Sequence, residues 1–209
     1  MTEHPIFFSS EMVRFILAGH KTQTRRVIKP QPIRNRIQVT KSGLWVSLDE
    51  AARFCPYGQP GDFLWVRETW GAVWPDDQEE TPLRDCHIEY RADLPLGSTD
   101  YPGSWPAEEA RGNDDAPKWR PSIFMPRWAS RIALEITSVR VERVQDISED
   151  DVKAEGISPH ILAKVILSLS DNPPDPRWKF IELWNSINSK RGYSWASNPW
   201  VRAISFIVV

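Results

Sequence analysis

The chain has 209 residues, with 26 Lys and Arg against 28 Asp and Glu, which gives a formal charge of −2. This length fits one domain, 1–209, and a content of 41% hydrophobic and 26% charged residues excludes a wholly disordered chain. No stretch reaches the roughly 18–20 consecutive apolar residues of a membrane helix, and the first residues lack the features of a secretory signal. Because two cysteines cannot make a disulfide framework, we expect a cytoplasmic protein without a membrane partner.

The near-zero net charge conceals an uneven distribution. Residues 1–36 carry seven Lys or Arg and two acids, residues 72–115 carry twelve acids and three bases, and residues 117–131 are basic again. The two basic segments suit a polyanion such as nucleic acid. Alternatively, the basic and acidic segments neutralise one another across the surface.

The first third of the chain predicts a helix, a polar strand and a long loop. Ser9 and Ser10 begin a helix over residues 10–18, where apolar side chains recur at helical spacing and Gly19 follows as a typical C-cap. Residues 21–27 are compatible with a strand. Residues 28–59 show no sustained period and predict a loop with one strand near 44–48.

The middle of the chain combines one clear strand with a long irregular segment. Pro60-Gly61-Asp62 predicts a turn, and residues 63–68 have the composition of a strand. Residues 74–121 are rich in Pro and Asp and contain one expected strand at 87–92. A loop of this length is uncommon inside a compact domain and is usually functional or mobile.

The C-terminal third predicts a strand, two or three helices and a closing strand. The alternation of apolar residues over 132–141 changes parity near Thr137-Ser138, which indicates a β-bulge. Ser148 and Asp151 have the spacing of a capping box for a helix that ends at Gly156. Amphipathic stretches follow over 161–169 and from 175 to 187, where Trp178, Ile181, Trp184 and Ile187 are expected on one face. Residues 201–209 predict a buried strand.

This order of elements lacks a regular alternation of strands and helices. It favours an α+β sheet or a small barrel over a doubly wound fold.

Three places in the sequence carry candidate chemistry. The segment after Gly19 gathers one ammonium, two hydroxyls and two guanidiniums, which can hold an anion or a polar heterocycle, or can simply face the negative end of the preceding helix dipole. The strand after Asp62 presents Arg67 on one face and Glu68 on the other, as a core strand with a solvated end also would. Glu155 lies in the last turn of its helix, where the dipole disfavours a carboxylate.

Metal and cofactor chemistry is not indicated. Cys55, Cys86 and His87 do not have the spacing of zinc ligands. We expect no metal and no cofactor.

Several blocks of the chain together resemble the ASCH domain family. They are Gly19-x-Lys21-Thr22-x-Thr24-x-Arg26, Pro60-Gly61-Asp62 with Leu64–Trp70, Met125–Arg131, Ser148…Glu155-Gly156 and Asn198–Val201. The chain is most similar to the longer members encoded by phages and prophages. The resemblance implies a PUA-like fold, a small β-barrel with flanking short helices beside a cleft, here with long loop insertions at about 28–59 and 72–127.

The same resemblance implies recognition of a modified nucleoside or RNA. Compact bacterial members are N4-acetylcytidine amidohydrolases, and their catalytic Lys, Thr and Glu fall on Lys21, Thr24 and Glu155. The expected substrate-binding residues are Thr22, Arg25, Arg26, Asp62, Arg67, Glu68, Arg127, Trp128 and Arg131. Arg25 replaces an apolar residue of the family pattern.

This assignment predicts a hydrolase of an N4-acylated cytidine amide. Thr24 would attack as the nucleophile, with Lys21 as the base and Glu155 orienting the lysine. Burial or neighbouring cations would have to lower the pKa of Lys21 for it to act as a base. In a regular strand Lys21 and Thr24 face opposite sides, so they approach each other only if Lys21 still lies in the turn after Gly19.

Two alternatives remain. The chain can be a non-catalytic module for RNA or single-stranded nucleic acid, with Arg and Lys side chains on phosphates and Trp119 or Trp128 stacking on bases. It can also be a ribonuclease that uses the same cleft, with lysine in place of histidine as the base.

Overall fold

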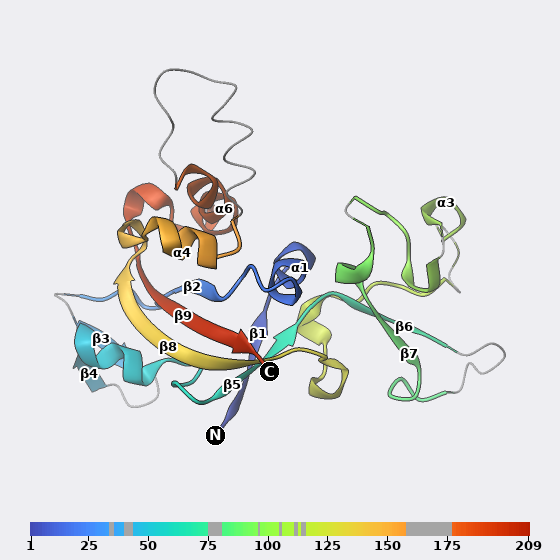
Figure 1. Cartoon of the computed structure of the whole chain (residues 1–209), viewed down its shortest axis with the longest axis horizontal. Helices are drawn as coiled ribbons and strands as arrows, with labels where there is room; N and C mark the ends of the chain where they lie inside the picture. The colour runs from blue at the N-terminus through green and yellow to red at the C-terminus, as the bar shows by residue number, and fades with distance from the viewer. Residues whose placement is uncertain are drawn as a thin grey trace, which may run out of the picture.

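Figure 1 shows a mixed structure of helices and strands around one main sheet. The computed structural model describes residues 1–33, 36–39, 44–74, 81–95, 97–104, 106–110, 113, 116–157 and 177–209. Its helices and strands in chain order are β1 Glu3–Phe7, α1 Ser10–Leu17, β2 Gln23–Val27, β3 Arg36–Val39, β4 Leu44–Ser47, α2 Leu48–Ala51, β5 Phe63–Arg67, β6 Trp70–Val73, β7 His87–Tyr90, α3 Ala107–Ala110, β8 Ala133–Arg143, α4 Glu149–Ala154, α6 Trp178–Asn188 and β9 Trp200–Val208.

The main sheet has five strands in the order β1-β5-β8-β9-β2. The β1–β5 pair is parallel, and the other three pairs are antiparallel. The register of β8 against β9 shifts between Ile136 and Ser138, which confirms the predicted bulge. The α+β class is therefore confirmed, but hydrogen bonds between the described strands do not close this sheet into the barrel that the resemblance implies, since β1 and β2 remain its edges.

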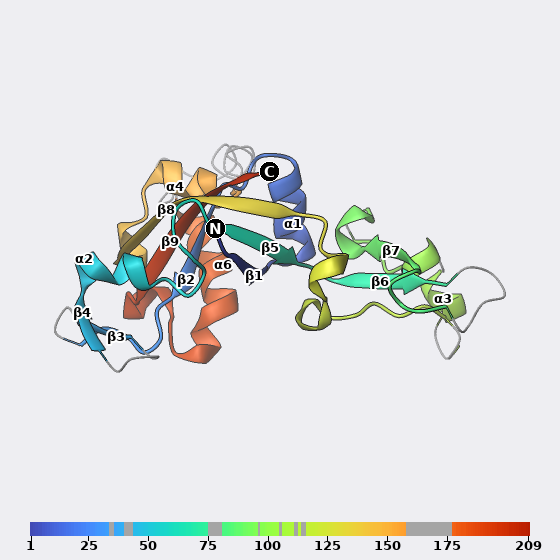
Figure 2. The same ribbon diagram turned by 90° about the horizontal axis from the view of Figure 1, so that it is seen from below.

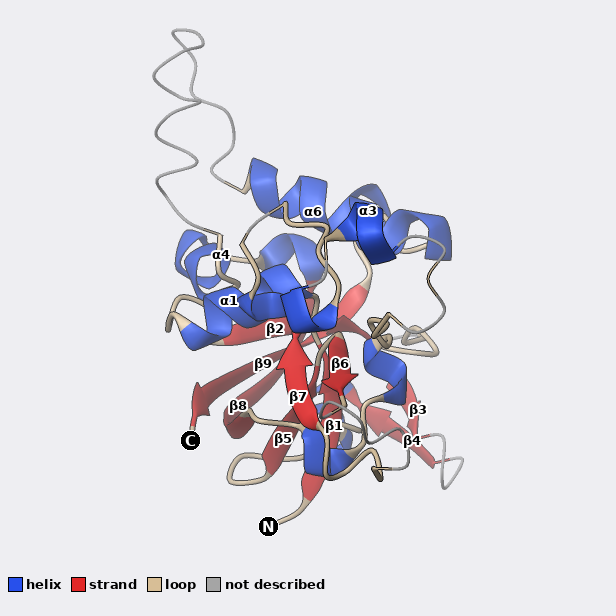
Figure 3. Ribbon diagram, turned by 90° about the vertical axis from the view of Figure 1, so that its right-hand side faces the viewer, coloured by secondary structure: helices blue, strands red, loops and turns tan. Residues whose placement is uncertain are grey.

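Short helices pack on the main sheet, and one of them, α1, links its two edge strands, β1 and β2. In Figure 3, α1, α4 and α6 lie together above the strands. Helix α1 connects the two edge strands and buries Val13 and Ile16 against Leu64, Leu134 and Ile204 of the sheet. A second apolar cluster joins α4 and α6 to the start of β9; its buried members are Val144, Ile147, Val152, Phe180, Trp184 and Val201. These two clusters position the helices that flank β2.

Both long insertions contain structure that the sequence pattern did not predict. Within 28–59, β3 and β4 form a hairpin followed by α2, where a loop with one strand was expected. The strand expected at 87–92 is confirmed as β7, but its partner β6, which begins at Trp70 just before the second insertion, was not predicted. Figures 1 and 2 show this pair with α3 to one side of the main sheet. The expected stretch at 161–169 lies outside the described residues. Among these, no helix is long and apolar enough to cross a bilayer.

The predicted helix face near the C-terminus is partly wrong. Helix α6 buries Phe180, Trp184 and Asn188, which follow one another at intervals of four residues. Ile187, expected on the buried face, is 41% exposed. The buried side of α6 is the one that carries Phe180 and Trp184, which pack in the cluster with Val152 of α4 and Val201 of β9; the Phe180 ring also lies 6.1 Å from the Trp195 indole.

The β6–β7 unit is joined to the main sheet by a buried ion pair. Glu68, which follows β5, is 1% exposed, and its two carboxylate oxygens accept hydrogen bonds from Arg131 at 3.1 and 3.2 Å. Arg131 also binds Asp93 and stacks on Tyr90, 3.9 Å from the ring centroid. Burial raises the pKa of Glu68, and the Arg131 guanidinium opposes that rise. The expected solvated end of this strand is therefore wrong.

We expect Arg131→Met to lower the free energy of unfolding by about 3 kcal/mol, because it leaves the Glu68 carboxylate buried without its partner. Urea unfolding measures this loss. The matched control is Arg127→Met, which breaks the exposed Arg127–Glu3 pair and should cost much less, because solvent screens an exposed pair. Equal losses in the two variants would contradict a structural role of the buried pair.

Candidate functional site

Lys21 and Glu155 meet in a buried ion pair although 134 positions separate them. The Lys21 ammonium donates to Glu155 Oε2 at 2.7 Å, to the Glu155 main-chain carbonyl at 2.8 Å and to the Gln23 carbonyl at 2.9 Å. Their side chains are 1% and 7% exposed. All three ammonium hydrogens are thus used inside the protein.

Local structure explains why the two residues meet. Lys21 precedes β2 and lies in the turn after α1, where its N–H donates to the Phe15 carbonyl at 3.0 Å. This is the placement required for Lys21 and Thr24 to approach each other. Glu155 is the C-cap of α4, whose Ser148–Asp151 capping box is present as predicted. The lysine compensates the unfavourable position of this carboxylate and also caps a carbonyl at the helix end.

Gly156 allows the close approach of the two segments. Its φ of +88° lies in the left-handed region, and a Cβ there would meet Cβ of Lys21 at 3.1 Å and Cβ of Phe15 at 3.2 Å. The backbone after α4 therefore packs directly on the stem of Lys21.

Arg25 extends the ion pair into a network. Its guanidinium donates to Glu155 Oε1 at 3.2 Å and to Glu142 Oε1 at 2.7 Å, and it lies 2.9 Å from Asp151 Oδ2. The Arg25 side chain is 1% exposed, so these partners replace its solvent. Arg25 was expected to bind substrate; its guanidinium is instead committed to acids of β8 and α4.

Burial changes the acid strength of Lys21. Removal of the ammonium from water lowers the pKa of Lys21, Glu155 opposes this shift, and Arg26 and Arg25 add to it. The shift has the direction that a catalytic base needs. The ammonium with three acceptors is nevertheless the form that this arrangement stabilises.

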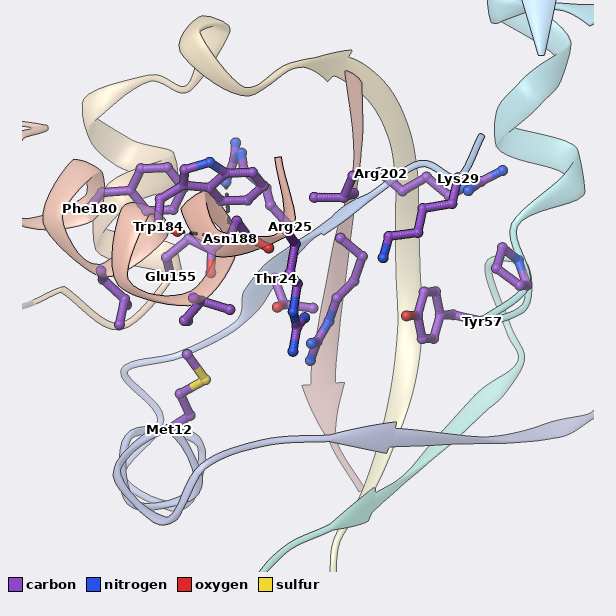
Figure 4. Close-up of a pocket in the computed structure, with 16 residues that line it drawn as sticks. Met12, Thr24, Arg25, Lys29, Tyr57, Glu155, Phe180, Trp184, Asn188 and Arg202 are labelled. Atoms are coloured by element: carbon purple, nitrogen blue, oxygen red, sulfur yellow. Dashed lines mark hydrogen bonds and ion pairs between the residues drawn. The ribbon is translucent and has the colours of Figure 1, made fainter. Parts of the chain in front are cut away.

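A pocket of about 380 Å³ opens beside this network, along the edge strand β2. Figure 4 shows Met12 of α1 below it, Phe180, Trp184 and Asn188 of α6 on one side, and Tyr57, Lys29 and Arg202 on the other. Thr24 and Glu155 both line it, whereas Lys21 does not line it and is bound to Glu155. Of the three predicted catalytic residues, Thr24 and Glu155 thus share a pocket, and Lys21 contacts Glu155 without lining that pocket.

The pocket is strongly cationic. Arg26, Lys29, Arg191 and Arg202 line it, together with Arg25 and Glu155, which are paired with each other. Arg26 and Arg202 are direct partners across the β2–β9 ladder. In the described part of the chain, the Nε atoms of both are buried without a hydrogen-bond partner, and burial lowers the pKa of both guanidiniums. Two like charges at paired positions are unfavourable unless an anion lies between them.

Other predicted binding residues lie elsewhere. Asp62 closes the turn before β5 by accepting from the main-chain N–H groups of Thr2 and Gln59, which lowers its pKa to about 2. Arg67 donates to the Ile123 carbonyl and lies over Phe7 and Trp65.

The basic segment after residue 117 is likewise used in structural contacts. Arg127 pairs with Glu3, Trp128 packs edge-on against Trp70, and Arg131 holds Glu68. Thr22 is exposed beside Lys21, and its main-chain groups bind Ala154 and Phe206. None of these residues lines the pocket.

Sequence reasoning missed most of the pocket walls. Tyr57, Lys29, Arg191 and Arg202 come from separate segments and carry no local pattern. Among the described residues, no group of three His, Cys, Asp or Glu side chains is placed to hold a metal ion. Comparison of the chain with protein-family models, curated proteins and solved structures finds no match.

We expect Gly156→Ala to destabilise the protein by about 1–3 kcal/mol, because the new methyl group combines a strained backbone with contacts on Lys21 and Phe15. Thermal or urea unfolding measures the loss. Gly19→Ala is the matched control: its φ is also positive, at +73°, but no atom lies within 4 Å of the added Cβ. If both substitutions cost the same, close packing on Lys21 has no energetic role.

Proposed function

We propose that this chain is a PUA-like protein of the ASCH type whose pocket binds a nucleotide, free or within RNA. The observation that carries the proposal is the Arg26–Arg202 pair, a half-buried and a buried arginine at opposed strand positions that both line the pocket. Each donates from Nη2 to a main-chain carbonyl, of Phe7 and Phe54 respectively, and each has an Nε without an acceptor among the described residues. A phosphate supplies the acceptor oxygens that these donors lack. The curved main sheet with short helices packed on it is compatible with the ASCH assignment (Figure 1), although the described strands do not close into a barrel.

The rest of the pocket suits the other parts of a nucleotide. Lys29 and Arg191 add positive charge near its wall, and Tyr57 and Trp184 offer aromatic surface to a base. Glu155, the carboxylate of the pocket, can accept a hydrogen bond from an exocyclic amino or amide N–H group. Phosphate and base therefore find complementary groups at different places in the same cavity.

Thr24 lines the same pocket as Glu155, the ion-pair partner of Lys21, and this supports hydrolysis of an acyl amide on the base as the reaction. The Thr24 hydroxyl attacks the acyl carbon and gives its proton to the neutral Lys21 amine; the C–N bond then breaks, and Lys21 returns the proton to the leaving amine. Water then attacks the acyl-threonine and gives a proton to Lys21. Lys21 passes this proton to the Thr24 oxygen as the carboxylic acid leaves. Glu155 holds the Lys21 nitrogen in place throughout.

The protonation state of Lys21 limits this reaction. The ammonium has no lone pair, so the active form is the neutral amine, whose population rises with pH. Because burial lowers the pKa of Lys21, this rise begins at less alkaline pH than for a solvated lysine. In this proposal Glu155 positions the Lys21 nitrogen, and burial lowers the pH at which the neutral amine becomes populated.

The binding proposal predicts that the wild type binds cytidine 5′-monophosphate at least tenfold more tightly than cytidine. A charge-assisted hydrogen bond contributes about 1.5–3 kcal/mol, or roughly 10- to 100-fold. Arg202→Met should remove this preference without lowering the free energy of unfolding, since it also removes the repulsion from Arg26. Isothermal titration at several salt concentrations measures both ligands.

Arg127→Met is the control for this experiment, because Arg127 pairs with Glu3 outside the pocket. It should bind both ligands as the wild type does. Equal affinity of the wild type for the nucleoside and the nucleotide, or a loss of binding in the Arg127 variant as large as in the Arg202 variant, would contradict the assigned phosphate position.

The catalytic proposal predicts that Thr24→Val abolishes acetate release from N4-acetylcytidine 5′-monophosphate. The change removes the hydroxyl and keeps the shape, so we expect a loss of at least about 10³-fold in kcat with the affinity within twofold. Thr22→Val, at the exposed neighbour, is the control. In the wild type kcat should rise with pH, with an apparent pKa below 10.5.

Each other outcome has a defined meaning. Acetate release by Thr24→Val at the wild-type rate would exclude Thr24 as the nucleophile. A wild type that binds the nucleotide but releases no acetate would favour the non-catalytic module. Cleavage of added RNA by the same protein preparation would favour the ribonuclease.

A further inference from the structure

A second pocket lies on the other side of Glu155. It has a volume of about 360 Å³ and is lined by residues of α1, the end of α4 and α6: Ser9, Glu11, Met12, Phe15, Glu155, Gly156, Ile157, Lys179, Glu182, Leu183 and Ser186. No step of the proposed binding or hydrolysis uses this cavity.

The two pockets are neighbours that share part of their walls. Met12, Glu155 and Leu183 line both. In Figure 4, the Met12 side chain extends from α1 toward the side chains of α6. An unbranched thioether adapts readily to its surroundings, so this boundary can admit a ligand that extends from one pocket into the other past Glu155.

The two pockets differ in charge and polarity. Besides the mutually paired Arg25 and Glu155, the first pocket has four cationic side chains, those of Arg26, Lys29, Arg191 and Arg202. The second pocket has, besides Glu155, the carboxylates of Glu11 and Glu182 and the ammonium of Lys179, which is bound to Glu182 at 2.7 Å. The second pocket also has the apolar walls of Met12, Phe15, Ile157 and Leu183. A phosphate is attracted to the first pocket and repelled from the second, which fixes the direction of the ligand.

We propose that the second pocket holds an aliphatic acyl group carried on the exocyclic nitrogen of the bound base. This inference rests on the proposed function: with the phosphate at Arg26 and Arg202 and the amide at Glu155, the acyl chain points away from the cations and into the apolar cavity. The preferred substrate is then a nucleotide with an acyl chain longer than acetyl. We do not place a neighbouring RNA nucleotide in this pocket, because its phosphate would face the carboxylates of Glu11 and Glu182.

Burial of the chain gives the expected size of the effect. Each buried methylene contributes about a fourfold gain in affinity. From the acetyl to the butanoyl compound, which adds two methylenes, we expect roughly 16-fold tighter binding, and a further gain for the hexanoyl compound until the pocket is filled.

The test compares cytidine 5′-monophosphate with its N4-acetyl, N4-butanoyl and N4-hexanoyl derivatives by isothermal titration. Thr24→Val serves as the background that keeps the ligands intact, and chromatography checks that they remain so. Ser186→Phe, at an exposed position of α6 that lines the second pocket, fills the cavity. It should abolish the gain with chain length and leave the affinity for cytidine 5′-monophosphate unchanged.

Two further variants serve as a control and as a second way to fill the pocket. Ser186→Ala removes the same hydroxyl, which donates to the Leu183 carbonyl, and should keep the gain. Glu182→Trp fills the cavity from another position and should abolish the gain even if Ser186→Phe fails to fold, which thermal unfolding reveals.

The outcomes separate this inference from the proposed function. If the unsubstituted nucleotide binds but affinity does not rise with chain length, or if both filling variants keep the gain, the acyl pocket is wrong and the nucleotide site stands. If the unsubstituted nucleotide does not bind, both proposals are overturned.

Discussion

The contact between Lys21 and Glu155 is the constraint on which the rest of the site depends. It ties the end of α4 to the residues just before β2, and the Thr22 main-chain N–H adds a 2.8 Å hydrogen bond to the Ala154 carbonyl at the same junction. Helix α4 in turn packs with α6 on the second apolar cluster. The ion pair therefore positions the floor of the pocket directly and its α6 wall through that cluster.

A buried ion pair is costly to desolvate, and this one is compensated by a layered network. Three acceptors surround the Lys21 ammonium, and Arg25 binds the other Glu155 oxygen while it is itself held by Glu142 and Asp151. Such a pair favours a unique geometry more than it favours stability. The same network favours the protonated form of Lys21, so the contacts that position this base oppose its activation. Burial acts in the other direction and lowers the pKa of Lys21.

Local sequence signals predicted the elements that local physics determines. The Ser148–Asp151 capping box, the turn at Asp62 and the bulge before Ser138 all depend on interactions within a few residues and were confirmed. The strand at β6 and the hairpin of β3 and β4 were missed because their stability comes from partners that no short window contains. The resemblance placed Lys21 and Glu155 together correctly, a contact across 134 positions that periodicity cannot reveal.

The density of charge along the sequence was a poor guide to the pocket for a physical reason. The basic segment at 117–131 binds acids from distant parts of the chain, with Arg127 on Glu3 and Arg131 on Glu68 and Asp93. What distinguishes a binding cation is the absence of such an acid, and that depends on strand register. Arg202 stands alone in an apolar strand and shows no local signal, yet the register of β9 sets it opposite Arg26. Arg26 and Arg202 each donate from Nη2 to a main-chain carbonyl, but their buried Nε atoms have no acceptor among the described residues. Two such opposed guanidiniums are stronger evidence for an anion site than a cluster of exposed lysines and arginines, because an anion can offset the cost of donors that the fold leaves unpaired.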